Sequence, residues 1–285
     1  MAAKLLEGKP IAENIKMALS AEVAALKVRH GRGPKLVAIQ IGENASSAVY
    51  IKAQKKCAES IGIDYELRVL PETASQSEIE NIIVGLNKDA SVSAVIIQMP
   101  VPKGIDSKKL LSMISPGKDA EGMHPENLGK VLSGHYNIAP CTAMAIMELL
   151  ESTGVNLYGK EAVVVGHSEI VGKPLALMLL NKFATTTVCH IATGERGALP
   201  EHVKRAEVLI VAVGKAGVVK GEWVRDGAIV IDVGINKVGE KIVGDVEFDI
   251  AEKKASYITP VPGGVGPLTT TILMRNTVEQ FKAKL

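Results

Sequence analysis

Short apolar runs alternate with helix-like segments along this chain, and no other feature restricts its possible folds as strongly. The runs at 34–42 (PKLVAIQIG), 92–102 (VSAVIIQMPVP) and 160–166 (KEAVVVG) are rich in Val and Ile, as expected of parallel strands that are buried on both faces. Between them, apolar residues recur at intervals of three and four, for example over residues 10–30, which is the spacing of an amphipathic helix. This alternation predicts an α/β protein with a mostly parallel sheet.

The alternation continues to the C-terminus and indicates two α/β domains. A second series of strands begins after the loop at 133–142, so we expect a boundary near residue 140 and a cleft between the domains. We expect Ser75 or Ser77 to cap one helix and Thr142 to cap another. The expected strands are 34–42, 64–71, 92–102, 160–166, 186–191, 208–214, 228–234 and 255–260, and the expected helices are 10–30, 46–60, 75–89, 142–150 and 268–285.

Composition narrows the class of protein. Aromatic residues make up only 3% of the 285 residues, so aliphatic side chains must form the core. A net charge of +2 without a basic run argues against nucleic-acid binding. No apolar run approaches the roughly 20 residues that a membrane helix needs, and no signal-peptide pattern opens the sequence. Cys57, Cys141 and Cys189 form no CxxC pair, which is typical of a reducing compartment. We therefore expect a cytoplasmic protein without a membrane partner.

The turn after the run at 160–166 is a candidate phosphate-binding loop. Its spacing is Gly166-x-Ser168-x-x-x-Gly172, and small residues between a strand and a helix let backbone N–H groups approach a phosphate. A tight turn without a ligand is the alternative, but the strands that follow favour a dinucleotide. Neither an acid nor an adjacent arginine follows the next strand, which ends at His190 and Ile191, and the nearby Glu195 and Arg196 are compatible with NAD or NADP.

Three other stretches carry candidate functional residues. The segment ITPVPGGVGPLTTTIL fixes an unusual backbone path that is either a ligand loop or a rigid turn. Gln98 ends an apolar strand, where it is either a site residue or a loop hydrogen-bonder. Asp119, Glu121 and His124 share one loop and form either an acid–base cluster or part of a solvated loop. They lack HxH or HxxxH spacing, so we expect no metal there.

Together these motifs resemble one known family. Tyr50, Gln98 and the segments GHSEIVGKP (166–174), DVGIN (232–236) and PVPGGVGPLT (260–269) occur in the order found in the bacterial methylenetetrahydrofolate dehydrogenase/cyclohydrolase family. The resemblance covers essentially the whole chain, and PVPGGVGPLT is its most specific part.

The resemblance implies a domain organisation and a reaction. It implies a catalytic, folate-binding domain at 1–140, completed by the C-terminal helix at 268–285, and a Rossmann-type NAD(P)-binding domain at 141–267, usually in a homodimer. A tetrahydrofolate derivative is expected in the cleft. In this family, hydride passes from 5,10-methylenetetrahydrofolate to NAD or NADP, and the resulting 5,10-methenyl cation is then hydrolysed to 10-formyltetrahydrofolate.

The resemblance also implies roles for individual residues. The positions that match the family's catalytic and folate-binding residues are Tyr50, Gln54, Gln98, Glu121, Pro262 and Gly263. The positions that match its cofactor contacts are Gly166, His167, Ser168, Ile191 and Ile235.

Four of these positions depart from the family pattern. Gln54 occupies the position of a catalytic lysine, and Glu121 that of an aspartate. His167 replaces a common arginine and Ile191 a serine or arginine. Since those last two residues commonly meet the 2′-phosphate of NADP in the family, their loss favours NAD.

Neighbouring lysines do not replace the missing one. At about 100° per residue, positions 50, 54, 57 and 61 share one helix face. Lys52 and Lys56 lie on the opposite side and Lys55 lies about 100° from Gln54, so these lysines are expected to be solvated.

We therefore expect a methylenetetrahydrofolate dehydrogenase with weak or absent cyclohydrolase activity. Hydride transfer mainly needs positioning, whereas hydrolysis needs a group that accepts protons, which an amide does not do. A bifunctional enzyme and a non-catalytic folate-binding paralogue are the alternatives.

Overall fold

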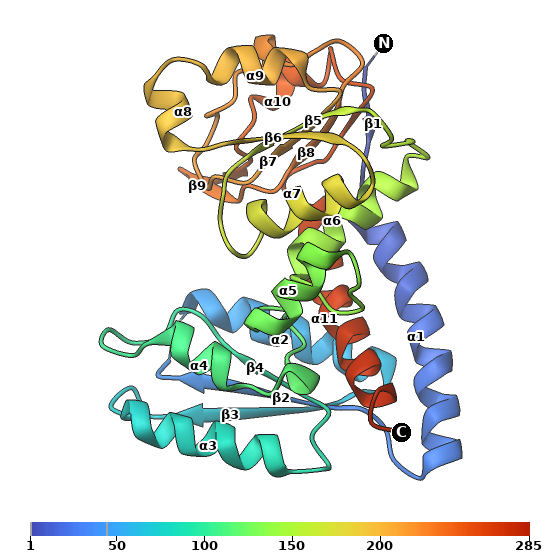
Figure 1. The fold of residues 1–285 in the computed structure, drawn as a ribbon, viewed down its shortest axis with the longest axis vertical. Coiled ribbons are helices and arrows are strands. Elements are labelled where there is room, and N and C mark those ends of the chain that lie inside the picture. The colour runs from blue at the N-terminus through green and yellow to red at the C-terminus, as the bar shows by residue number, and fades with distance from the viewer. Residues whose placement is uncertain (1, 44) are drawn as a thin grey trace. The chain divides into compact units, whose positions relative to one another are not determined.

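The computed structural model describes residues 2–43 and 45–285 and contains two compact units (Figure 1). We call them the three-stranded unit (Glu13–Lys130, His135–Cys141 and Thr270–Leu285) and the six-stranded unit (Met1–Ala12, Val131–Gly134 and Thr142–Thr269). Both contain a parallel sheet flanked by helices, so the predicted two-domain α/β fold is confirmed.

The three-stranded unit is built on a sheet with the order β3-β2-β4. Its strands are β2 (Lys35–Ile41), β3 (Asp64–Leu70) and β4 (Ala94–Ile97), all parallel. Helices α3 and α4 pack against alternate residues of β2 and β4 and form one hydrophobic cluster with them. The helices that lie wholly or mostly in this unit are α1 (Gly8–His30), α2 (Ala45–Ile61), α3 (Gln76–Lys88), α4 (Ser107–Met113), η1 (Pro116–Lys118), α5 (Pro125–Ser133) and α11 (Val265–Lys282).

The six-stranded unit is built on a parallel sheet with the order β1-β11-β8-β7-β5-β6. Its apolar core is formed chiefly by Val, Ala, Leu and Ile. The strands are β1 (Lys4–Leu5), β5 (Glu161–Val165), β6 (Thr185–Cys189), β7 (Val208–Val211), β8 (Ile229–Asp232) and β11 (Tyr257–Ile258), with a separate hairpin of β9 (Asn236–Val238) and β10 (Lys241–Val243). The remaining helices are α6 (Cys141–Ser152), α7 (Gly172–Asn181), α8 (Ile191–Glu195), α9 (Leu199–Arg205), η2 (Gly221–Trp223) and α10 (Phe248–Ala251).

Element ends differ from the sequence-based expectations in several places. Ser75 caps α3 in a capping box with Glu78, as predicted. Thr142 lies inside α6 rather than before it, because the helix begins at Cys141. The strand expected at 186–191 ends at Cys189, because the chain turns into α8 at Ile191.

The compact units also differ from the expected ranges 1–140 and 141–267. Residues 1–12 belong to the six-stranded unit, since β1 pairs with β11 through Lys4↔Tyr257 and Leu5↔Ile258. A strand of two residues has no alternation that the sequence could reveal. The last helix begins at Val265 and is divided between the units after Thr269.

None of the helices in the described ranges is long and apolar enough to cross a lipid bilayer.

Candidate functional site

A buried amide pair lies at the carboxyl end of β4, where α/β proteins commonly place their sites. Gln54 comes from α2, Gln98 follows β4 directly, and both are less than a tenth exposed. Nε2 of Gln98 donates to Oε1 of Gln54 at 2.8 Å. Oη of Tyr65, on β3, donates to the same oxygen at 3.0 Å. Two predicted site residues, Gln54 and Gln98, are thus hydrogen-bonded to each other, and Gln54 also accepts from Tyr65, a residue that was not predicted.

The hydrogen bonds orient the Gln54 side chain. Because Oε1 accepts from both Tyr65 and Gln98, the amide nitrogen points to the other side, and it makes no hydrogen bond to any described residue. Burial raises the pKa of Tyr65 to about 12, so its hydroxyl stays a neutral donor near pH 7. Gln54 therefore offers two N–H donors from a fixed position but no titratable group.

Helix α2 presents the faces expected from its spacing. Gln54, Cys57 and Ile61 are buried, whereas the lysines at 52, 55 and 56 are exposed. Tyr50, one turn before Gln54, is 49% exposed and so remains available to a ligand. The prediction that these lysines are solvated is confirmed.

Glu121 lies beside the amide pair. Its carboxylate accepts a hydrogen bond from the backbone of Ile97, the residue before Gln98. Burial raises the pKa of Glu121 to about 8, the nearby Asp119 carboxylate adds to the rise, and the Ile97 hydrogen bond opposes it. Close to neutral pH, Glu121 can therefore hold or release a proton next to Gln98.

Asp119 has a structural role in the same loop. Its buried carboxylate accepts from the backbone N–H of Gly122 at 3.0 Å and of His124 at 2.8 Å, and from the side chain of Asn127 at 2.9 Å. These bonds fix the loop that carries Glu121. Among the described residues, no group of three His, Cys, Asp or Glu side chains is arranged to hold a metal ion.

The raised pKa of Glu121 predicts a dependence of stability on pH. An acid whose pKa is higher in the folded than in the unfolded state stabilises the fold at low pH, and this stabilisation is lost as the pH rises from about 4.5 to about 8. In the wild type this loss lowers the free energy of unfolding by at most about 1.4 kcal/mol per pH unit, and we expect Glu121→Gln to lack it. Thermal unfolding of the wild type and of Glu121→Gln at pH 5, 6.5 and 8 measures the difference. A constant difference in Tm across this range would contradict the raised pKa.

The predicted phosphate-binding turn connects β5 to α7. Gly166 has φ +122°, and a Cβ there would lie 2.2 Å from the carbonyl oxygen of Ala212. A Cβ on Gly172 would lie 2.0 Å from the carbonyl oxygen of Gly166, so both positions require glycine. Between them, Oγ of Ser168 accepts from the backbone N–H of Val171 at 3.1 Å. His167 and Ser168 are exposed at the mouth of this turn.

The other predicted cofactor residues lie after the carboxyl ends of β6 and β8, which β5 and β7 separate in the sheet. Ile191 follows β6 and is 75% exposed, and Ile235 follows β8 and is 56% exposed. The rings of His167 and His190 meet edge to face, with centroids 5.3 Å apart. The structure thus brings the ends of β5 and β6 together, and the contacts assigned to these residues stay predictions.

Two buried aspartates that were not predicted fix the loops after β7 and β8. Asp245 is fully buried and accepts from the backbone N–H groups of residues 213–215 at 2.7, 2.8 and 2.9 Å and from Nδ2 of Asn236 at 2.8 Å. Asp232 accepts from the backbone N–H groups of Gly234, Asp245 and Val246. Burial raises the pKa of Asp232 to about 6 against these hydrogen bonds. The loop that carries Ile235 is therefore held by carboxylates.

The segment at 260–264 lies in the six-stranded unit. Its backbone is fixed by hydrogen bonds from Gly8 N–H to the Gly263 carbonyl at 2.9 Å and from Gly264 N–H to the Pro260 carbonyl at 2.8 Å. Pro262 and Gly263 are exposed. They belong to a different unit from Gln54 and Gln98, and their predicted contact with folate stays a prediction.

Comparison with known proteins identifies the family. The model of the tetrahydrofolate dehydrogenase/cyclohydrolase catalytic domain matches residues 6–121, and the model of the NAD(P)-binding domain of the same family matches residues 140–285. The chain belongs to the tetrahydrofolate dehydrogenase/cyclohydrolase family.

Similar members of this family cover the whole chain. The Bifunctional protein FolD of a Nitratiruptor species is 44% identical over 281 residues, which are 99% of each chain. The solved structure of the bifunctional FolD from Campylobacter jejuni is 41% identical, with a TM-score of 0.96 over 100% of each chain. The Trypanosoma brucei FolD structure, complexed with NADP cofactor and inhibitor, is 40% identical, with a TM-score of 0.94 over 99% of this chain and 98% of that one.

Membership in the tetrahydrofolate dehydrogenase/cyclohydrolase family confirms the predicted family and the enzyme class, an oxidoreductase that uses NAD(P). It leaves the individual residue roles as predictions.

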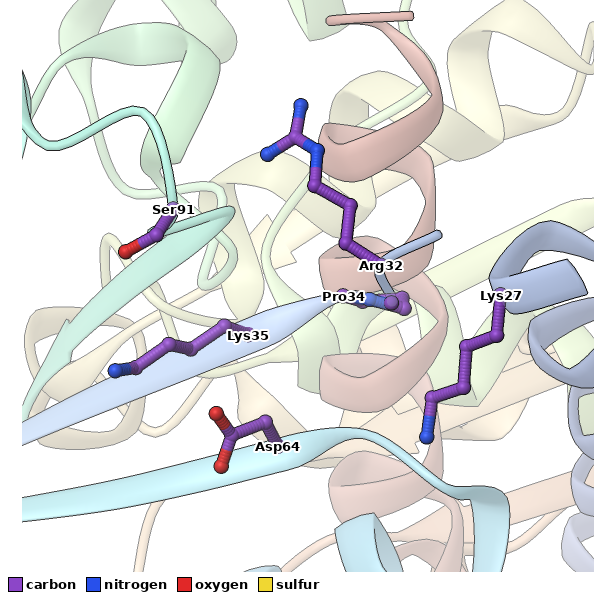
Figure 2. A pocket seen from close by; sticks show the side chains of 7 residues that line it. Lys27, Arg32, Pro34, Lys35, Asp64 and Ser91 are labelled. Atoms are coloured by element: carbon purple, nitrogen blue, oxygen red, sulfur yellow. The ribbon is translucent and has the colours of Figure 1, made fainter. Parts of the chain in front are cut away.

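A pocket in the three-stranded unit lies apart from the residues described above. It has a volume of about 280 Å³ and lies at the amino ends of β2 and β3, where Lys35 and Asp64 begin the strands. Figure 2 shows Lys27, Arg32 and Lys35 pointing in different directions. Lys35 is already paired with Glu66 at 2.6 Å. Since its cations converge on no common point, we assign it no ligand.

Proposed function

We propose that this chain is a 5,10-methylenetetrahydrofolate dehydrogenase with weak methenyltetrahydrofolate cyclohydrolase activity. The dehydrogenase reaction moves a hydride from the methylene carbon of the folate to NAD(P)⁺, which gives NAD(P)H and the 5,10-methenyl cation. The observation that carries the proposal is the fixed, non-titrating amide of Gln54, held by Tyr65 and Gln98.

The dehydrogenase step suits this arrangement. Hydride transfer needs the donor and acceptor carbons held together, and this positioning supplies much of the rate. The free N–H donors of Gln54 and the exposed hydroxyl of Tyr50 can orient the folate, and Glu121 can accept from its pterin. The cofactor contacts are assigned to the positions that match the family, which are Gly166, His167, Ser168, Ile191 and Ile235.

The same arrangement around Gln54 is less suited to hydrolysis of the methenyl cation. Water must first add to the methenyl carbon and lose a proton. One carbon–nitrogen bond must then break, and its nitrogen must take up a proton. A side chain that transfers these protons typically contributes about 10²–10⁴-fold. An amide has no pKa near neutrality, so Gln54 orients the substrate without exchanging protons.

A bifunctional enzyme is the second candidate. The similar relatives are themselves called bifunctional, and the pKa of Glu121, about 8, gives the site one group that exchanges protons near neutral pH. In that case Glu121 rather than residue 54 would accept the proton from water.

Two assays on the purified full chain test the proposal. Reduction of NAD⁺ and of NADP⁺ by methylenetetrahydrofolate is followed by absorbance, and hydrolysis of added methenyltetrahydrofolate is followed by loss of its own absorbance above the uncatalysed rate. We expect the first activity and little of the second. Comparable rates for both would establish the bifunctional candidate, and no reduction of either nicotinamide would indicate a non-catalytic folate-binding paralogue.

We also propose that the protein forms a homodimer through the edge of the six-stranded sheet. Strand β6 is an edge strand, and Tyr158 and Phe183 beside it are 72% and 71% exposed, with ring centroids 5.6 Å apart. Leu180 adds a further half-exposed apolar side chain. Exposed aromatic clusters beside an unpaired strand are typical of protein interfaces.

Replacing one aromatic residue tests the dimer. Phe183 has φ +60°, which asparagine tolerates better than most residues, so Phe183→Asn should fold. We expect the dissociation constant of the dimer to rise by at least about tenfold, as for a central interface residue. Size-exclusion chromatography with light scattering over a dilution series measures this constant. Val28→Asn, at an 88% exposed position in α1, is the control. A monomeric wild-type protein at all concentrations would refute the proposal.

A further inference from the structure

Two amide side chains of the last helix hold the loop that carries Glu121. Asn276 and Gln280 are buried and lie one turn apart on α11, so they face the same side of the helix. Nε2 of Gln280 donates to the carbonyl oxygen of Asp119 at 3.1 Å. Nδ2 of Asn276 donates to the carbonyl oxygen of Ala120 at 2.8 Å. The two carbonyl groups that precede Glu121 are thus both fixed by α11.

The bond from Asn276 acts on the peptide group next to Glu121. The Ala120 carbonyl belongs to the planar unit that ends at the Cα atom of Glu121, so holding its oxygen sets the direction in which the chain reaches this residue. On the other side, the N–H of Gly122 donates to the Asp119 carboxylate at 3.0 Å. The backbone of Glu121 is therefore held on both sides, and its side chain starts from a fixed point.

The Asn276 amide carries a buried acceptor that finds no donor. Its Nδ2 donates to the carbonyl oxygens of Ala120 and, at 3.4 Å, of Ala139. Turning the amide over would bring Oδ1 against both carbonyl oxygens. In the favourable orientation Oδ1 faces the other way, buried and without a hydrogen-bond partner among the residues that the structure describes. Such an acceptor lowers stability, and residues that break this rule commonly serve function. Asn276 thus contributes through its donors.

We propose that Asn276 is a positioning residue, which acts through Glu121 to place its carboxyl group against the pterin of the folate. This inference rests on the proposed dehydrogenase function, in which Glu121 accepts from the pterin. The Glu121 carboxylate also accepts from the backbone of Ile97, the residue before Gln98. Since a misplacement of about 1 Å is enough to weaken a substrate contact strongly, a loop released by α11 would hold the folate less well.

Binding of tetrahydrofolate tests the proposal without hydride transfer. This folate carries the reduced pterin but no one-carbon bridge, and titration calorimetry under reducing conditions measures its affinity for the full chain. We expect Glu121→Ala to weaken binding at least about tenfold, as for the loss of one hydrogen bond to a carboxyl group. We expect Asn276→Leu to weaken it about fivefold. Because Asn276 acts through Glu121, the double variant should bind no more than about twofold more weakly than Glu121→Ala alone.

The pH dependence of stability gives a second measurement, which needs no ligand. Besides the Ile97 backbone, the groups that act electrostatically around Glu121 are Asp119 in its own loop, Cys141 on α6 and, through Cys141, Arg275 on α11. Release of the loop should let water reach Glu121 and lower its pKa from about 8 towards its usual value. The loss of stability between pH 5 and pH 8 should then be smaller in Asn276→Leu than in the wild type. Each protein is compared with its Glu121→Gln counterpart by thermal unfolding.

Thr277→Val is the matched control on the same helix. Thr277 is buried, and its hydroxyl donates to the carbonyl oxygen of Leu273 in α11 at 2.9 Å. The change removes a buried polar group of similar size, and we expect neither the affinity nor the pH dependence to move. If Asn276→Leu does not fold, Asn276→Ser takes its place, because its hydroxyl is too short to reach the Ala120 carbonyl.

The outcomes separate this proposal from the proposed function. Wild-type affinity and wild-type pH dependence in Asn276→Leu, or losses of affinity that add in the double variant, would overturn the role of Asn276. A wild type that binds tetrahydrofolate but reduces neither nicotinamide would overturn only the dehydrogenase. A wild type that binds no tetrahydrofolate would refute the folate contact in both proposals, and the weaker pH dependence of Asn276→Leu would still establish that Asn276 holds Glu121.

Discussion

Gln54→Lys is expected to raise the rate of methenyltetrahydrofolate hydrolysis by about 10²–10⁴-fold. The reason is local. Residue 54 lies beside Gln98 and Tyr65, and its terminal nitrogen has no hydrogen-bond partner among the residues that the structure describes. A lysine amine placed there would reach the same space and could exchange protons. Tyr65 and Gln98 can both reorient to accept from the amine. Dehydrogenase activity should change much less, because it depends on positioning.

The control for this experiment is a lysine elsewhere on the same helix. Ala53→Lys adds an amine at the exposed neighbouring position and should leave hydrolysis at the wild-type rate. A Gln54→Lys protein that binds folate and reduces NAD(P)⁺ but hydrolyses no faster than wild type would contradict the role of residue 54. Wild-type hydrolysis that is already rapid and falls in Glu121→Gln would assign proton transfer to Glu121 instead.

Asp245→Ala is expected to lower the free energy of unfolding by about 3 kcal/mol or more, because each hydrogen bond to a charged group contributes about 1.5–3 kcal/mol. Four donors lose their acceptor, namely three consecutive backbone N–H groups at 213–215 and the side chain of Asn236. Denaturant unfolding measures the loss. Weaker cofactor binding should accompany it, since the loops after β7 and β8 are no longer held together.

Asp226→Ala is the matched control for this change. Its side chain is 87% exposed, and its carboxylate forms a surface ion pair with Lys254 at 3.7 Å. Such a pair typically contributes less than about 1 kcal/mol. Asp245→Asn should fall between the two, because one amide oxygen still accepts hydrogen bonds while the NH₂ group faces donors. A loss below about 1 kcal/mol in Asp245→Ala would show that water replaces the carboxylate.

The sequence predicts regular elements better than it predicts the partners of individual side chains. Ser75 and Glu78 lie within one turn and specify a helix start by themselves. The spacing along α2 likewise places Gln54 on the buried face and the lysines on the exposed one. Both features are local, and local geometry follows from helix periodicity.

The contacts that define the site join distant segments. Gln54 meets Gln98 only because β2 pairs with β4, with Ile39 opposite Ile97. The sequence of neither strand specifies this register. Tyr65 could have been suspected, since a tyrosine near the start of a strand is often buried and then needs a partner for its hydroxyl. In the sequence, nothing distinguishes Asp245 from an ordinary polar residue after a hairpin. Only the tertiary structure reveals the four groups that donate hydrogen bonds to its carboxylate.

The pairing of β1 with β11 has a consequence for how the chain folds during synthesis. Strand β1 cannot pair until the ribosome has added Tyr257, the partner of Lys4. The three-stranded unit is completed only by residues 270–285. Neither unit can therefore finish folding on the ribosome as a separate N-terminal domain, in contrast to the usual order in multidomain proteins. The edges of β1 and β8 that β11 covers stay unpaired until residues 257 and 258 are made, so we expect folding yield to depend on chaperones or slow synthesis more than the stability of the finished protein suggests. Ribosome-bound chains truncated before residue 257 should accordingly be far more sensitive to protease than the released protein.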